Sequence, residues 1–309
     1  MSALHANLLL LLSAIFWGAG NVAQKSVLED LGPLTTIGLR CLIGALVIAP
    51  LLWRESGHAG TVPRAAWSRV LIAALLFAAA IGSQQFAFSG TSVTNGSFLI
   101  TTTTVITPLV AWFLLRERPG LILLPTIALT LLGVCLLGGG AFSALAWGDL
   151  CALGSALIYS IWIVHLGRLV AATRRPGAIT LAQFVLAGAL ALALGLAIEP
   201  FDLARLRGAW PELVVLGVFA TGLAYVFQAL AQQRTSASIA AVIMSAECVF
   251  GAIGGHIVLG ERLSLMGATG AALILAAVLL VQVNPMPAWR AIGRPAIGAI
   301  AATAHAKRM

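Results

Sequence analysis

A single carboxylate, Glu247, lies near the middle of an apolar stretch that runs from Ile239 to Arg262. An ionisable side chain at bilayer depth is costly, so such residues usually face a bundle interior or a wet cavity. Three roles suit Glu247: proton carrier, counter-charge for an ammonium group, or hydrogen-bonding partner between helices. Gly251 and Gly255 follow it at i+4 and i+8 on the same helix face, where we expect another backbone to approach closely.

Amide and aromatic side chains recur at helical spacing in other apolar stretches. Trp17, Asn21 and Gln24 share one face of the first stretch, and Tyr159 and Trp162 share one face of a later stretch. Because polar groups in lipid-embedded helices turn inward, these faces predict a common cavity. Amides and aromatic rings suit a zwitterionic or cationic solute with an apolar body. For Asn21 and Gln24, hydrogen bonds between helices are an equal alternative.

The predicted cavity takes side chains from several apolar stretches. Its expected lining consists of Trp17, Asn21, Gln24, Gln84, Phe88, Thr103, Tyr159, Trp162, Tyr225, Gln228 and Glu247. Thr103 belongs to a run of threonines, whose hydroxyls can also satisfy themselves on carbonyls one turn back. The predicted lining contains no cluster of cations, which argues against phosphorylated ligands.

Three further charged residues are predicted to act at helix ends or as gates: Arg40, Glu117 and Glu261. Arg40 lies within the second apolar stretch, and we expect its side chain to snorkel to an interface. Glu117 and Glu261 lie beside arginines at the ends of two stretches. Solvated ion pairs or helix-end latches are favoured there over a role in the cavity.

The composition is typical of a membrane protein. Of 309 residues, 60% are hydrophobic and 9% are charged, and the mean hydropathy is +1.02. A bilayer core needs about 20 apolar residues per helix. We therefore predict an all-α polytopic membrane protein. Its ten transmembrane helices are expected at roughly residues 5–24, 34–53, 70–88, 93–115, 121–137, 147–165, 178–198, 211–232, 239–262 and 265–282.

The basic residues and the cysteines exclude several other classes of protein. The net charge of +8 resides in loops between apolar stretches and does not form a nucleic-acid-binding face. No glycine-rich stretch ends in Gly-Lys-Ser or Gly-Lys-Thr, so the sequence contains no phosphate loop. The four cysteines fall within predicted helices without metal-ligand spacing, and we interpret them as packing residues. We expect no cofactor, no bound metal and no nucleic-acid partner.

The distribution of charge between the loops predicts the orientation of the chain. Basic loops usually stay on the cytoplasmic side of a membrane. With both termini inside, thirteen Arg and Lys side chains fall on the cytoplasmic side of the ten-helix arrangement, and four fall outside. We therefore expect cytoplasmic N- and C-termini.

The two halves of the chain resemble each other. The segment from Ser13 to Gly18 resembles the segment from Ser155 to Ser160 at an offset of 142, and residues 116–118 resemble residues 260–262 at an offset of 144. A five-helix repeat is odd-numbered, so its second copy enters the membrane inverted, which suits alternating access. The predicted division is 1–140 for the first repeat, 141–284 for the second, and 285–309 for a basic cytoplasmic tail.

Five features combine along nearly the whole chain: the Trp17 motif, Leu39-Arg40, Glu117, Glu247 and residues 260–262. Together they resemble the EamA branch of the drug/metabolite transporter superfamily. The resemblance implies a ten-helix secondary transporter with a central cavity between the halves, typically an exporter of metabolites or amphipathic compounds. The chain most resembles YddG-type aromatic amino-acid exporters. In that family a proline usually follows the carboxylate of helix nine, and Cys248 stands here instead, which weakens the expectation of a kink.

We therefore expect an inner-membrane secondary transporter that works by alternating access. Its expected cargo is small amphipathic metabolites, above all aromatic amino acids or related cationic compounds, exported from the cell. Export or exchange of another metabolite or drug class is the alternative. An intramembrane enzyme is disfavoured, because the chain lacks a His-Glu-x-x-His helix, a Gly-x-Ser-x-Gly elbow and paired aspartates. The expected partners are a small-molecule substrate and the lipid bilayer, and the chain is expected to act as a monomer.

Overall fold

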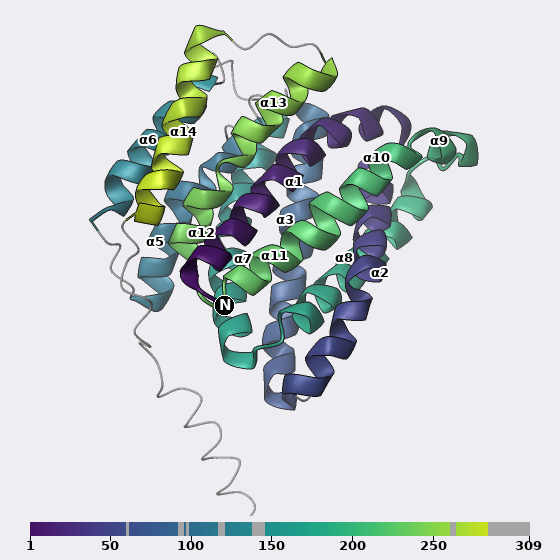
Figure 1. Ribbon diagram of the computed structural model, residues 1–309. Helices are drawn as coiled ribbons and strands as arrows, with labels where there is room; N and C mark the ends of the chain where they lie inside the picture. Colours follow the sequence, from purple (N-terminus) through teal and green to yellow (C-terminus); the bar gives the residue numbers. More distant parts are fainter. Residues whose placement is uncertain are drawn as a thin grey trace, which may run out of the picture.

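The computed structural model describes residues 1–59, 62–91, 96, 99–116, 121–137, 146–259 and 264–283 (Figure 1). This described part of the chain is helical and contains no strand. Its α-helices are α1 (Ala3–Asp30), α2 (Pro33–Ala59), α3 (Trp67–Gly90), α5 (Thr103–Leu115), α6 (Leu123–Leu137), α7 (Trp147–Thr173), α8 (Pro176–Ile198), α9 (Leu203–Gly208), α10 (Trp210–Val214), α11 (Ala224–Ala231), α12 (Ala237–Met244), α13 (Glu247–Leu259) and α14 (Leu265–Val283). A short 3-10 turn (Arg64–Ala66) precedes α3, and a π-helical segment (Val215–Leu223) joins α10 to α11.

Seven of the described helical segments are long and apolar enough to cross a membrane. Three shorter apolar helices accompany them: Leu99–Leu115, Leu123–Leu137 and Leu265–Leu280. Helices suit a bilayer because they satisfy their backbone hydrogen bonds internally. The all-helical prediction is confirmed for the described residues, and the count of ten transmembrane helices stays a prediction. Glu117, Glu261 and the predicted tail, 285–309, lie outside the described residues.

The outer surface of the bundle is strongly apolar. Large hydrophobic side chains are exposed on several helices, among them Leu46, Phe113, Leu121, Ile257 and Leu265. Many polar side chains are instead buried between the helices. This distribution suits a protein whose surface meets lipid and whose polar groups must find partners inside.

The helices pack largely in pairs (Figure 1). α2 lies against α8, α3 against α7, and α6 against α14, while α1 packs on α13, α11 and the π-helical segment. Two serines make equivalent contacts: Ser13 Oγ donates to Ala224 O at 2.8 Å, and Ser155 Oγ donates to Ala80 O at 3.0 Å. The two donors are 142 residues apart in sequence and the two acceptors 144. α1 and α7 are therefore packed on α11 and α3, respectively, through equivalent serine contacts.

At each end of the α2–α8 pair, a carboxylate from one helix bonds to the start of the other helix. Glu199, the residue after α8, accepts hydrogen bonds from Leu34 N and from Thr35 N, each at 2.8 Å, and from Thr35 Oγ1. The first N–H groups of a helix lack intrahelical partners, and the helix dipole is positive there. Glu199 therefore caps the start of α2 from the neighbouring helix.

Glu55 forms the matching cap at the opposite end of the same pair. Its carboxylate accepts hydrogen bonds from Gly177 N at 2.6 Å and Ala178 N at 3.2 Å, and Arg175 Nε lies 3.5 Å away. Glu55 and Glu199 are 144 residues apart in sequence. We call Glu55 and Glu199 the reciprocal caps, because each belongs to the end of one helix and caps the start of the other.

α1 and α13 cross with their backbones in close contact. A Cβ atom added to Gly18 would lie 2.6 Å from Gly251 N and 2.8 Å from Glu247 O. The close backbone approach that the sequence predicts at Gly251 is therefore confirmed, and it holds the start of α13 beside α1. For Gly255 the same expectation stays a prediction.

The predicted ninth span is not one continuous helix. It divides into α12 and α13 at a turn formed by Ser245 and Ala246. Ser245 Oγ donates to Val242 O at 2.6 Å, and Cys248 N donates to Ser245 O at 3.3 Å. No proline follows Glu247, so the sequence weakens the expectation of a kink. A break is nevertheless present, and at this point the local bonds of Ser245 and Cys248 replace the regular helical pattern.

Candidate functional site

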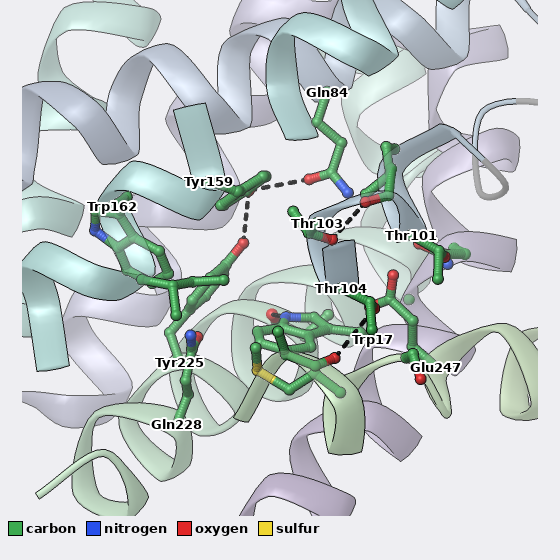
Figure 2. Close-up of a pocket in the computed structure, with 18 of the residues that line it drawn as sticks. Trp17, Gln84, Thr101, Thr103, Thr104, Tyr159, Trp162, Tyr225, Gln228 and Glu247 are labelled. Carbon is green, nitrogen blue, oxygen red and sulfur yellow. Dashed lines mark hydrogen bonds between the residues drawn. The ribbon is translucent and has the colours of Figure 1, made fainter. Parts of the chain in front are cut away.

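A cavity lies between α1, α2, α3, α5, α7, α11, α12, α13 and the π-helical segment. The space among its lining side chains, including the part that is open to solvent, is about 680 Å³. Most of the side chains that the sequence predicts for the cavity line its wall. Figure 2 labels Trp17, Gln84, Thr103, Tyr159, Trp162, Tyr225, Gln228 and Glu247. Asn21 and Gln24 line the same wall.

Phe88 does not line the cavity, which corrects the prediction for this residue. Its side chain is buried in a separate apolar cluster with Ile100 and Ala152. The ring of Phe88 has no polar group, so burial against these apolar neighbours is its most favourable environment. Spacing along α3 could not distinguish this cluster from the cavity.

Tyr225 lies at the centre of an aromatic cluster. The centroid of its ring is 5.0 Å from those of Trp17 and Phe77, 5.7 Å from that of Trp162, and 5.9 Å from that of Phe184, all in edge-on arrangements. Such pairs are favourable because a ring edge is electropositive and a ring face is electronegative. Tyr225 therefore joins α1, α3, α7 and α8 on one side of the cavity.

Polar groups in the wall form a short chain of hydrogen bonds. Tyr159 OH donates to Gln84 Oε1 at 3.0 Å, and the hydroxyls of Tyr159 and Tyr225 lie 2.8 Å apart. In the view of Figure 2, Gln228 lies near Tyr225, and Glu247 lies on the other side of Trp17. Gln228 is fully buried, and neither its amide oxygen nor its amide nitrogen has a hydrogen-bond partner within the described chain. Buried amides without partners are rare, so the Gln228 amide is available to bond with a polar group in the cavity.

The π-helical segment presents polar atoms to α1 and α2. Trp17 Nε1 donates to Ala220 O at 2.8 Å, and Arg40 Nε donates to Thr221 Oγ1 at 2.8 Å. π-Helical turns depart from regular α-helical bonding and occur often at functional sites. The segment thus fixes one aromatic and one cationic side chain at the cavity.

Arg40 points into the bundle and not toward a membrane interface. Its side chain is 3% exposed, lines the cavity, and donates from Nη1 to Gln24 Oε1 at 3.0 Å. The prediction that Arg40 snorkels from a helix end is therefore wrong. This face of α2 meets α1 and the π-helical segment, where Gln24 and Thr221 supply acceptors that hold the guanidinium inside.

Glu247 is the first residue of α13 and lies in the cavity wall. A carboxylate suits this place, because the start of a helix carries a partial positive charge. Among the residues that the structure describes, no hydrogen bond or ion pair to the Glu247 carboxylate is formed. The three roles that suit Glu247, namely proton carrier, counter-charge and hydrogen-bonding partner between helices, stay as hypotheses.

Sequence reasoning did not predict several other lining residues, including Thr101, Thr104, Met244 and Ser245. The threonine run was a usable signal, but helical spacing does not tell which hydroxyl is satisfied locally. Thr103, for example, lines the cavity and also donates to Ile100 O one turn back. Met244 and Ser245 flank the break between α12 and α13. Within the described ranges, no three His, Cys, Asp or Glu side chains come together to hold a metal ion.

Known proteins resemble the chain along nearly its full length. An uncharacterized transporter of Archaeoglobus fulgidus is 28% identical over 284 residues, which cover 91% of this chain and 87% of the relative. The uncharacterized transporter YwfM of Bacillus subtilis is 26% identical over 284 residues, with 90% and 94% covered. A protein crystal structure of 20% sequence identity has a TM-score of 0.76 over 90% of this chain and 96% of that chain, which is a likeness of fold.

The family comparison covers both halves of the chain. The model of the EamA-like transporter family matches residues 4–139 and, separately, residues 146–283. The first match contains Trp17 and Arg40, and the second contains Tyr225 and Glu247. With these matches and its apolar helices, the protein is a multi-pass membrane protein that belongs to the EamA-like transporter family.

Proposed function

We propose that the protein is a secondary transporter that exports small amphipathic metabolites across the inner membrane, with aromatic amino acids as the first candidates. The observation that carries this proposal is a cavity that combines the aromatic cluster around Tyr225 with amides and charged groups. An aromatic solute would pack against the rings, while polar wall groups would bind its ionic end. An exporter of the YddG type is the proposed subtype, and the aromatic wall of the cavity supports it.

Alternating access is the proposed mechanism. In many secondary transporters, interrupted helices from two inverted repeats surround a central site. The break before Glu247 and the π-helical segment beside Trp17 and Arg40 support this mechanism, because both interruptions adjoin the cavity. The two separate family matches support the division into repeats at 1–140 and 141–284.

The proposed transporter has cytoplasmic termini and acts as a monomer. The orientation rests on the charge of the loops, of which thirteen basic residues fall on one side and four on the other. A monomer suffices because residues of both halves of one chain line the same cavity.

The proposal is tested by measuring flux of labelled aromatic amino acids into proteoliposomes that contain the purified protein. Glu247→Gln keeps the size of the side chain and removes its charge and its titrating proton. We expect saturable flux with the wild type, and flux lower by at least about 10-fold with Glu247→Gln, because an amide replaces neither a proton carrier nor a counter-charge. Glu29→Gln is the matched control, because Glu29 is exposed at the end of α1.

The outcomes separate the parts of the proposal. Loss of flux with Glu247→Gln and normal flux with Glu29→Gln would support a role of the Glu247 carboxylate in transport. Normal flux with both variants would remove Glu247 from the mechanism and leave the exporter intact. If the wild type moves no aromatic amino acid, the proposed cargo is wrong.

A further inference from the structure

We propose that Arg40 binds the carboxylate of the transported solute, so that the cavity selects carboxylate-bearing solutes over amines and amides of the same shape. The inference rests on the proposed function and names the chemistry of its substrate. The sequence predicts either aromatic amino acids or related cationic compounds as the cargo. The inference favours aromatic amino acids, because they carry a carboxylate.

The guanidinium of Arg40 is held by two neutral groups. Its Nε donates to Thr221 Oγ1 at 2.8 Å and its Nη1 to Gln24 Oε1 at 3.0 Å. These bonds come from two different elements and fix the orientation of the fork. A guanidinium has five N–H donors, so three of them have no partner within the described chain.

The charge of Arg40 also lacks a counter-charge. No carboxylate of the described residues forms an ion pair with it, whereas Arg175, at the end of the α2–α8 pair, has Glu55. An unpaired cation that is 3% exposed at the centre of an apolar bundle is costly and calls for an anionic partner. Because Arg40 lines the cavity, an anionic ligand can reach it there.

A further feature is an amide donor beside the guanidinium. Gln24 is 3% exposed and accepts from Arg40 through Oε1, while its Nε2 has no hydrogen-bond partner within the described chain. The amide N–H groups of Gln24 and the remaining N–H groups of Arg40 together form a set of donors without acceptors. A carboxylate offers two oxygens with several lone pairs, which matches such a set.

The number of cations favours one carboxylate over a phosphate group. Arg40 is the one Arg or Lys among the residues that line the cavity, and phosphate recognition usually takes several cations. In the second half, Gln183 lies 143 residues after Arg40, and it accepts from Trp162 Nε1 at 2.5 Å. Arg40 thus has a neutral amide, Gln183, as its counterpart in the second half. The cavity therefore offers one cationic position for an anion, beside an aromatic wall.

Binding of matched ligands to the full-length purified protein tests the inference. The panel is tryptophan, tryptophanamide, tryptamine and leucine, and the readout is the dissociation constant from ligand-dependent thermal stabilisation. We expect the wild type to bind tryptophan about 10- to 100-fold more tightly than tryptophanamide or tryptamine, the usual range for a charged hydrogen bond. Arg40→Gln should remove this difference, and Arg40→Lys should keep part of it, because an ammonium retains the charge without the planar fork. Arg64→Gln, at an exposed position in the turn before α3, is the control.

The inference fails if Arg40→Gln keeps the wild-type preference for tryptophan. It also fails if the wild type binds neither tryptophan nor leucine more tightly than it binds tryptophanamide and tryptamine. If Arg40→Gln does not fold, Arg40→Lys and the wild-type panel still decide. A wild type that binds carboxylates through Arg40 but transports none would refute the proposed function and leave this inference standing. Flux of tryptophan and tryptophanamide at equal rates and affinities would refute this inference and leave the exporter standing.

Discussion

Tyr225 contributes to the cavity in two separable ways, through its ring and through its hydroxyl. Tyr225→Phe removes the hydroxyl that lies 2.8 Å from Tyr159 OH and keeps the ring contacts. We expect the free energy of unfolding to fall by about 1 kcal/mol. Tyr225→Ala removes the ring as well, and we expect a loss of about 3–5 kcal/mol. Denaturation of both variants in detergent measures the difference, and equal losses would show that the ring packing is not the larger contribution.

At the scale of residues, helical spacing within one stretch groups side chains that lie together in the wall of the cavity. Trp17, Asn21 and Gln24 were found as one face of the first stretch, and the structure places all three in the wall. Helical spacing does not predict which way the side chains of Arg40 and Phe88 point. A lone cation at bilayer depth can reach outward or inward, and only the acceptors on neighbouring helices decide between the two.

At the scale of helices, the crossing of α1 and α13 depends on the absence of a side chain at Gly18. A Cβ atom there would lie 2.6 Å from both Gly251 N and Phe250 Cβ, so Gly18→Ala must push the two helices apart. We expect a lower midpoint of thermal unfolding and weaker transport, because the start of α13 carries Glu247. Gly82→Ala is the matched control, since its Cβ would meet nothing within 4 Å.

Gly82→Ala should leave the midpoint unchanged or raise it, because alanine is favoured over glycine within a helix by up to about 1 kcal/mol. The same loss of stability in both variants would mean that the close crossing at Gly18 does not explain the effect of Gly18→Ala, because the higher helix propensity of alanine cannot lower stability.

The lengths of the apolar stretches predict where most helices lie, but they do not predict where those helices are interrupted. The π-helical segment and the break at Ser245 and Ala246 carry no proline. Tertiary partners accompany the first of these: Ala220 O accepts from Trp17, and Ala224 O accepts from Ser13. Such bonds join residues more than 200 positions apart, so no local pattern contains them.

At the scale of the whole molecule, inverted repeats make equivalent loops face opposite sides of the membrane. In a cysteine-free background, we expect Asp30→Cys and Gly208→Cys to react with an impermeant maleimide on intact cells. Arg64→Cys and Ala172→Cys should react only after permeabilisation. Asp30 and Ala172 are 142 residues apart and Arg64 and Gly208 are 144 apart, so each equivalent pair should label from opposite sides. Labelling of both members of a pair from the same side would contradict the inversion.

The sequence offset of 142 to 144 residues predicts a repeat of helices, because similar motifs stand at helix starts and ends in both halves. It could not predict how the halves pack. The crossed serine contacts and the reciprocal caps involve partners on α2, α3, α8 and α11 that carry no motif of their own, namely backbone N–H and carbonyl groups.

The reciprocal caps make α2 and α8 behave as a strut of fixed length. Sliding of one helix along the other by a single residue, about 1.5 Å, would strain the bonds of Glu55 and Glu199 at the same time. We therefore expect the strut to move as one rigid body, and the proposed alternating access would then require motion of other helices around it. Arg40 is part of this strut, whereas Gln24 and Thr221 belong to α1 and the π-helical segment. A solute bound at Arg40 would thus rest on the stationary part of the molecule while its surroundings rearrange.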